Sequence, residues 1–158
     1  MTGYNLTDDS QKQEELEGGI PSSDRLRRGE GPDAELRYAR SLELARAGVQ
    51  VAHENGGREI KLLDMRQESS MFDYFVVATG SSRRQLHAIS EDIDHKLEDD
   101  LQDKRMGLEG YDNSRWILLD YGSVVFHLFD DEAREYYSLE ALWAGAPEID
   151  ISDLLQDT

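Results

Sequence analysis

The chain has 158 residues and a formal net charge of −17, from 34 acidic and 17 basic side chains. This length suits one domain with terminal extensions. The chain has no cysteine, which excludes disulfides, thiolate zinc sites and cysteine nucleophiles. The acidity argues against direct nucleic-acid binding over a broad face, because phosphate binding needs clustered lysine and arginine.

Targeting signals are not evident in the sequence. No segment approaches the roughly 18 consecutive apolar residues of a membrane-spanning helix, so we expect no membrane partner. The first residues, MTGYNLTDDSQKQEELEGG, lack the basic region and the apolar core of a secretory signal. We therefore expect a cytoplasmic protein.

The two ends of the chain differ in composition from its centre. Residues 1–35 hold nine acidic and four basic side chains, few large apolar residues, and much Gly, Ser and Gln. Such a segment cannot bury enough surface to offset its chain entropy. We predict a disordered acidic extension over residues 1–37, an α/β domain over 38–147, and an acidic tail over 148–158.

The first half of the predicted domain alternates helix and strand. A helix over 41–57 is indicated by apolar residues three or four apart, and its end by glycines: Leu42, Ala45, Val49, Ala52, then Asn55-Gly56-Gly57. Residues 59–66 and 71–80 are typical of strands. A second helix, capped by Ser81 or Ser82, is predicted by a longer apolar repeat: Leu86, Ile89, Ile93, Leu97 and Leu101.

The second half continues with strands and a last helix. Residues 106–110 suit a short edge strand, and 115–129 suit two strands around a turn at Tyr121-Gly122, where glycine supplies a positive φ. Three acidic residues from Asp130 open a helix that ends at residues 145–147. Its expected inward side chains are Tyr136, Leu139, Leu142 and Trp143. The prediction is a mixed sheet of four to five strands with helices packed on it, in the order α-β-β-α-(β)-β-β-α.

One motif suggests nucleotide chemistry. Gly80-Ser81, followed after ten residues by Asp92 and Asp94, mimics the phosphate-gripping turn and paired carboxylates of nucleotidyl transferases. On a helix, residues i and i+2 lie roughly 200° apart, so these carboxylates would not share one ion. The simpler interpretation is a turn and a helix cap. A nucleotide-binding or nucleotidyl-transferase-like enzyme that uses the Gly80-Ser81 turn is the alternative hypothesis.

Other catalytic patterns are weak. The four histidines show no metal-ligand spacing, and a Ser123-His127-Asp120 triad lacks the Gly-x-Ser-x-Gly turn of such nucleophiles. We therefore expect no cofactor, no metal and no catalytic residue. Aromatic and charged residues are instead concentrated in the last two strands and the last helix, a combination that suits a protein interface.

Three blocks of the sequence resemble a known family. They span Asp73 to Ser82, Gly107 to Gly110, and Trp116 to Trp143, and the last block is the most specific. In this block the family-like residues are Trp116, Asp120, Gly122, His127, Arg134, Tyr137, Leu139, Glu140, Leu142 and Trp143. Over roughly residues 41–146 the chain is similar to the ribosomal silencing factors (RsfS, or Iojap-like proteins).

This resemblance implies a compact α/β domain without catalysis. It implies binding to the fourteenth protein of the large ribosomal subunit, a block on association with the small subunit, and repression of translation under starvation. A homodimer in the free state is also implied. The acidic charge suits a basic ribosomal partner. The contact candidates are Asp73, Tyr74, Trp116, Asp120, His127, Glu132, Arg134, Tyr137 and Glu140.

Overall fold

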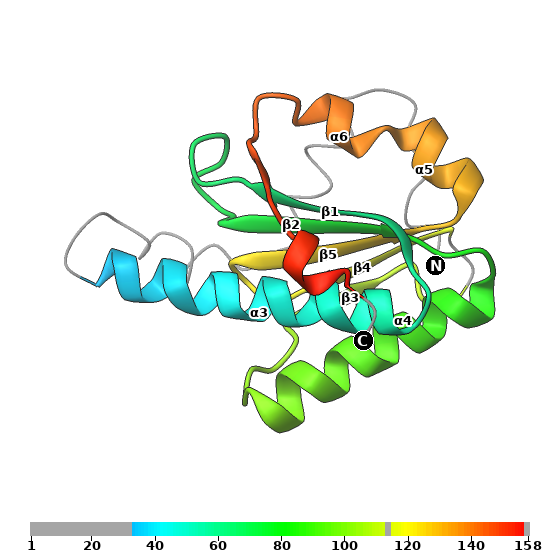
Figure 1. Ribbon diagram of the computed structural model, residues 1–158, viewed down its shortest axis with the longest axis horizontal. Helices are drawn as coiled ribbons and strands as arrows, with labels where there is room; N and C mark the ends of the chain where they lie inside the picture. The colour runs from blue at the N-terminus through cyan, green and yellow to red at the C-terminus, as the bar shows by residue number, and fades with distance from the viewer. Residues whose placement is uncertain (1–32, 113–114, 157–158) are drawn as a thin grey trace.

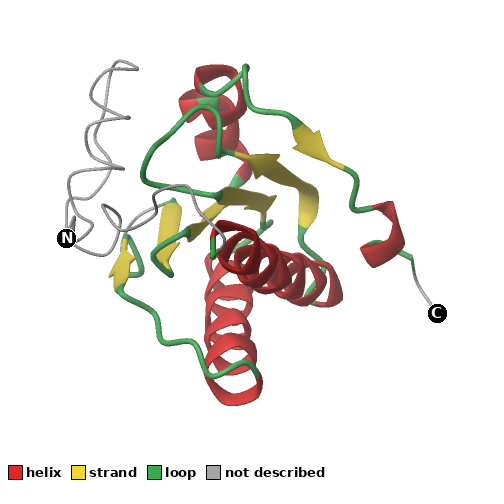
Figure 2. Ribbon diagram, turned by 90° about the vertical axis from the view of Figure 1, so that its left-hand side faces the viewer, coloured by secondary structure: helices red, strands yellow, loops and turns green. Residues whose placement is uncertain are grey.

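The computed structural model describes residues 33–112 and 115–156, and the rest is drawn as a grey trace in Figures 1 and 2. A mixed β-sheet lies between two layers of helices (Figure 1). Helices α3 (Ala34–Glu54) and α4 (Arg83–His95) cover one face, and α5 (Asp131–Tyr137) and α6 (Leu139–Leu142) lie over the other. The predicted α/β class is confirmed.

Six strands form the sheet, in the order β3-β4-β5-β2-β1-β6. Only β2 and β5 pair in parallel, and the other neighbouring pairs are antiparallel. The sheet has more strands than predicted because a short strand near the C-terminus joins its edge. The strand bounds are β1 (Arg58–Asp64), β2 (Tyr74–Thr79), β3 (Gly107–Glu109), β4 (Trp116–Asp120), β5 (Val124–Phe129) and β6 (Glu148–Ile149).

Alternation along the strands builds two hydrophobic cores. Successive side chains of a strand point to opposite faces of the sheet. On β5, Val124 and Phe126 therefore join the core under α3 and α4, while Val125 and Phe129 join the core under α5 and α6. Strands β2, β4 and β5 are buried along their whole length. Their apolar sequences follow from this burial on both faces.

Helix α4 agrees with the predicted apolar repeat. Leu86, Ile89 and Ile93 are buried, and the Ser82 side chain accepts a hydrogen bond from the backbone N–H of Gln85. The helix does not stay regular to the end of the repeat, because Lys96–Asp100 form a π-helical turn, η1. The predicted cap and apolar face are confirmed.

The first helix begins before the predicted domain start at residue 38. Helix α3 begins at Ala34, and this alanine is already buried. The helix therefore begins seven residues before the predicted helix start at residue 41. Residues 1–32 of the predicted disordered extension lie outside the described residues.

The predicted acidic tail packs on the domain where the structure describes it. Strand β6 pairs with β1, and Ile151 is buried in the core under α3. A 3-10 turn, η2 (Ser152–Leu154), follows, and Asp153 forms an ion pair with Arg46 of α3. Residues 148–155 therefore pack on the domain, and they run across the β1 edge of the sheet towards α3 (Figure 1).

The predicted last helix is two helices. Ser138 adopts a left-handed backbone conformation, with φ of 45°, between α5 and α6. The break changes the helical phase, so the expectation that Tyr136 points inward is wrong. Its side chain is 60% exposed, whereas the neighbouring Tyr137 is 8% exposed.

Candidate interaction surface

Most of the nine predicted contact residues are buried. Seven of them have 8% or less of their surface exposed: Asp73, Tyr74, Trp116, Asp120, His127, Arg134 and Tyr137. Their polar groups bond within the domain instead of facing outward. These seven residues therefore offer a partner little surface in this conformation, whereas the side chains of Glu132 and Glu140 are 79% and 26% exposed. Which of the nine residues contact a partner stays a prediction.

Trp116 and His127 form the polar centre of the core under α5 and α6. The indole N–H of Trp116 donates to Nδ1 of His127 over 3.1 Å. Because an indole nitrogen only donates, Nδ1 must accept and the imidazole proton sits on Nε2. Among the described residues Nε2 has no hydrogen-bond partner. Complete burial lowers the pKa of His127 to about 3, so the ring is neutral at physiological pH.

Asp73 and Tyr74 lie at the start of β2 and are also held internally. The Ser41 hydroxyl donates to Asp73 over 2.8 Å, and it lies 2.7 Å from the Ser123 hydroxyl. The guanidinium of Arg66 lies 5.5 Å from the centre of the Tyr74 ring. These contacts tie α3 to the beginnings of β2 and β5, so the two residues have structural roles.

Asp120 and Tyr137 likewise support neighbouring elements. The Asp120 carboxylate accepts from the backbone N–H of Gly122 over 2.7 Å, which fixes the predicted turn between β4 and β5. Gly122 has φ of 87°, as the predicted turn requires. The Tyr137 ring packs 4.8 Å from the Trp116 ring, centre to centre.

Arg134 is buried where four elements meet. Its guanidinium donates to the Thr79 hydroxyl at the end of β2 and to the Glu59 carbonyl of β1, both over 2.7 Å. It also forms an ion pair with Glu140 of α6. Only 7% of Arg134 is exposed, so the residue connects α5 to the sheet and to α6.

The exposed side of α5 and α6 carries carboxylates around one tyrosine. We name it the α5–α6 surface, and its residues are Asp131, Glu132, Glu135, Tyr136 and Glu140. Helix α5 begins at the predicted place. The Asp130 carboxylate caps it by accepting a hydrogen bond from the backbone N–H of Ala133 over 2.8 Å. Arg58 and Arg115 pair with Asp131 and Glu132 at its margins.

This surface has the chemistry of a contact for a basic protein. Its acids favour encounter with positive charge, and an exposed tyrosine can bury area while its hydroxyl keeps a hydrogen bond. Tyr136 is the only aromatic residue among the large apolar side chains that the described part of the chain exposes; the others are Leu36 and Met106. The sequence pattern missed Tyr136 because the helix break at Ser138 was not predicted.

The residues of the nucleotidyl-transferase hypothesis do not converge. Asp92 and Asp94 both lie in α4, as the apolar repeat predicts. Asp94 accepts from the Tyr121 hydroxyl and pairs with Arg105. At the Gly80-Ser81 turn, the Ser81 backbone N–H donates to the Gln85 side chain over 2.6 Å. This amide is therefore satisfied within the turn.

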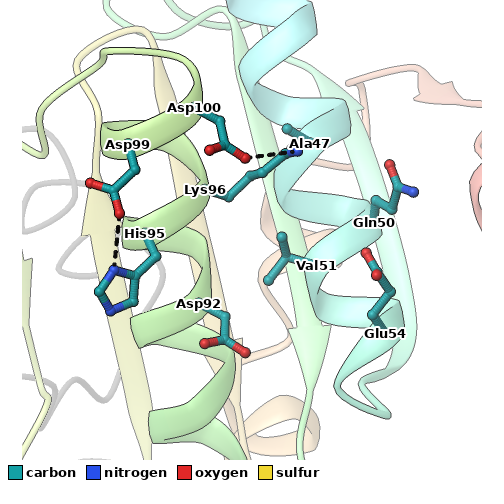
Figure 3. A pocket seen from close by; sticks show the side chains of 9 residues that line it. All are labelled: Ala47, Gln50, Val51, Glu54, Asp92, His95, Lys96, Asp99 and Asp100. Carbon is teal, nitrogen blue, oxygen red and sulfur yellow. Dashed lines mark hydrogen bonds and ion pairs between the residues drawn. The ribbon is translucent and has the colours of Figure 1, made fainter.

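A groove lies between α3 and the end of α4, on the other side of the sheet from the α5–α6 surface. Its volume is about 460 Å³, and Asp92 lines it from α4 opposite Glu54 of α3 (Figure 3). Lys96 pairs with Asp100 across one turn of η1. In the described ranges, 33–112 and 115–156, no group of three or more histidine or acidic side chains is arranged to hold a metal ion.

A helix that spans a membrane must be both long and apolar. Within the part of the chain that the structure describes, no helix meets both conditions.

The sheet, its two helical layers and the α5–α6 surface define an acidic three-layer α/β domain. Crystal structures with this fold are known. One, from Chromobacterium violaceum, is 33% identical, with a TM-score of 0.63 over 66% of this chain and 86% of that chain. Another, from Bacillus halodurans, is 33% identical, with a TM-score of 0.57 over 69% of this chain and 95% of that chain.

Sequence comparison identifies the family. Residues 38–158 match the family model described as "Ribosomal silencing factor during starvation". A protein of Bacillus subtilis named ribosomal silencing factor RsfS is 44% identical over 59% of this chain and 78% of its own length. The protein of that name from Halalkalibacterium halodurans is 32% identical over 72% of this chain and 96% of its own length. The chain belongs to the ribosomal silencing factor family.

Some relatives have other names. The mouse protein named "Mitochondrial assembly of ribosomal large subunit protein 1" is 36% identical over 60% of this chain, which corresponds to 42% of the mouse protein. The family match extends through residue 158, so it includes the C-terminal segment that packs on the domain.

Proposed function

We propose that this protein binds the large ribosomal subunit through its fourteenth protein and sterically blocks association with the small subunit. The effect would be repression of translation during starvation. The observation that carries this proposal is the family match over residues 38–158. The name of the mouse relative, which refers to assembly of the large ribosomal subunit, supports the same partner.

The charge of the chain supports a protein contact on the subunit. Ribosomal proteins are basic, and a chain with a net charge of −17 is attracted to them while ribosomal RNA repels it. Steric blocking needs an interface of standard size, about 1,600 Å² in total, and no reacting group. We propose the α5–α6 surface as part of that interface, because it combines exposed carboxylates with Tyr136.

Co-sedimentation with purified large subunits tests the proposal. The full chain should pellet with large subunits, and it should reduce the formation of joined ribosomes when small subunits and Mg²⁺ are added. Normal joining in the presence of saturating protein would reject the blocking role. A variant large subunit that lacks its fourteenth protein should fail to retain the chain.

Charge reversal of single exposed glutamates tests which surface of the protein contacts the large subunit. We expect Glu135→Lys to weaken subunit binding about tenfold at low salt, and less at high salt, because salt screens exposed charges. Glu54→Lys is the matched control, since it makes the same change in net charge in the groove on the other side of the sheet. Equal weakening by both variants would mean that net charge, and not the α5–α6 surface, determines binding.

The homodimer implied by the family resemblance is a separate proposal. Sedimentation velocity of the free chain over a range of concentrations checks it. If self-association uses the α5–α6 surface, Glu135→Lys will change the dimer fraction, whereas Glu54→Lys will not.

A further inference from the structure

We infer that Arg134 is a positioning residue for the α5–α6 surface: through Glu140 it fixes α6 relative to α5 and to the sheet. This inference rests on the proposed function for its relevance to binding. The sequence presented Arg134 as a contact residue, but burial prevents it from meeting a partner. Its contacts can instead determine where the exposed residues of the α5–α6 surface lie.

The connection between α5 and α6 does little by itself to fix the position of α6 relative to α5. It consists of Ser138 in a left-handed conformation, which is rare for residues with a side chain. Helix α6 is only four residues long. A helix of this length is not stable alone, so contacts with the rest of the domain must determine its position.

The guanidinium supplies contacts in several directions. Arg134 reaches the Thr79 hydroxyl and the Glu59 carbonyl, each over 2.7 Å, and pairs with Glu140. Two of these acceptors belong to the sheet and the third belongs to α6. An arginine presents five N–H groups in a rigid plane, so it can hold acceptors in different directions at once, which a single ammonium group does less well.

The acceptor on β1 is itself held in an uncommon geometry. Glu59 has φ of 49°, and the pairing of β1 with β2 is irregular between Arg58 and Lys61. At this irregularity the Glu59 carbonyl accepts from Arg134, and the neighbouring Arg58 reaches Asp131 at the start of α5, over 2.9 Å. The bulge thus contacts α5 at two points.

The position of Glu140 follows from this network. Its side chain is 26% exposed, so one carboxylate contributes both to the ion pair with Arg134 and to the α5–α6 surface. Trp143, directly after α6, packs its ring 5.9 Å from Phe75 of β2, centre to centre. The indole of Trp143 is therefore a reporter of where α6 lies.

The test compares Arg134→Lys, Arg134→Met and Thr79→Val with the control Arg115→Met in the full chain. Arg115 is an exposed arginine that pairs with Glu132 at the margin of the same surface. Thr79→Val removes one acceptor and keeps the charge, so it remains informative if an Arg134 variant does not fold. The first measurement is the ¹H–¹⁵N indole signal of Trp143 in the free protein, with the Trp116 signal as an internal reference.

We expect Arg134→Lys and Arg134→Met to shift the Trp143 signal and to weaken binding to large subunits about tenfold. Thr79→Val should cause smaller changes of the same kind. The Trp116 signal should stay close to its wild-type position in Arg134→Lys. Arg115→Met should leave the Trp143 signal unchanged.

Two results would overturn the inference. If both Arg134→Lys and Arg134→Met keep the Trp143 signal and the affinity of the wild type, Arg134 does not position α6. If the Trp143 signal shifts in the variants while their affinity stays at the wild-type value, the position of α6 does not control binding. Failure of the wild-type chain to bind subunits would instead reject the proposed function, and the Trp143 signal would still show whether Arg134 positions α6.

Discussion

At the scale of single residues, burial distinguishes side chains that stabilise the fold from side chains that can contact a partner. Trp116, His127 and Arg134 are the kind of aromatic and charged side chains that often anchor interfaces, yet all three are inside the domain. The Trp116 indole bonds to His127 on the neighbouring strand, and Arg134 reaches Thr79, which lies 55 residues earlier in the chain. Residue type alone could not predict this, because it depends on which strands become neighbours.

His127 should make stability depend on pH. Its pKa is lowered by burial to about 3 in the folded protein, whereas an unfolded histidine titrates near about 6.5. Between these values the unfolded chain binds a proton that the folded chain does not. The free energy of unfolding should therefore fall as pH decreases from about 6.5 towards 3, by up to about 1.4 kcal/mol per pH unit from this group, and be unaffected by it above about pH 7.

Urea unfolding of wild type and His127→Gln between pH 4.5 and 7.5 measures this contribution. Glutamine keeps an acceptor for Trp116 but does not titrate in this range. The difference in the free energy of unfolding between the two proteins should vary with pH. A difference that is constant with pH would show that His127 does not titrate with a lowered pKa.

At the scale of elements, the sequence predicted those that carry their own periodic signal. The apolar repeat and the serine cap of α4 are visible in the sequence because they are local, and the turn at Gly122 is visible because glycine is needed there. Strand β6 has no such signal, since two residues pair with β1 only after the chain has returned to the sheet edge. The break at Ser138 was missed because a serine does not ordinarily favour a left-handed conformation.

Gly48 shows how tertiary packing overrides a helix preference. Glycine weakens an isolated helix, and alanine at this position would favour α3 by about 1 kcal/mol on propensity alone. A Cβ atom at Gly48, however, would lie 2.0 Å from Cε1 of Phe126, which is on the sheet beneath the helix. The helix can lie close to β5 only because residue 48 has no side chain.

We therefore expect Gly48→Ala to lower the free energy of unfolding by about 1–3 kcal/mol, as overpacking of a core does. Thermal or urea unfolding measures the change. Alanine at Gln50, an exposed position on the same helix, is the control and should change stability by less than about 0.5 kcal/mol. Greater stability of Gly48→Ala would mean that α3 can shift away from Phe126 without loss.

At the scale of the whole molecule, the position of the α5–α6 surface depends on the hydrophobic cores on both faces of the sheet. The core under α5 and α6 fixes the two helices that carry the α5–α6 surface. The core under α3 and α4 packs against the opposite face of the same sheet. The sequence predicted the order of most elements and the acidic, aromatic character of the C-terminal half. Which aromatic side chain faces outward followed only from the packing, where Tyr137 takes the inner position and Tyr136 the outer one.

The C-terminal segment should contribute to the stability of the whole domain. Ile151 is 6% exposed and packs in the core under α3, so Ile151→Ala should lower the free energy of unfolding by about 2–5 kcal/mol. Gln156→Ala, at an exposed position of the same segment, is the control and should have little effect. Equal stability of wild type and Ile151→Ala would show that the segment detaches readily.

The pairing of β6 with β1 also has a consequence for synthesis of the protein. Strand β1 lies near the start of the domain, and its outer edge stays open until the last residues of the domain have left the ribosomal tunnel. A nascent chain that stalls before residue 148 therefore exposes an unpaired strand. The first strand of the domain therefore stays unpaired on its outer side until the last strand has been made.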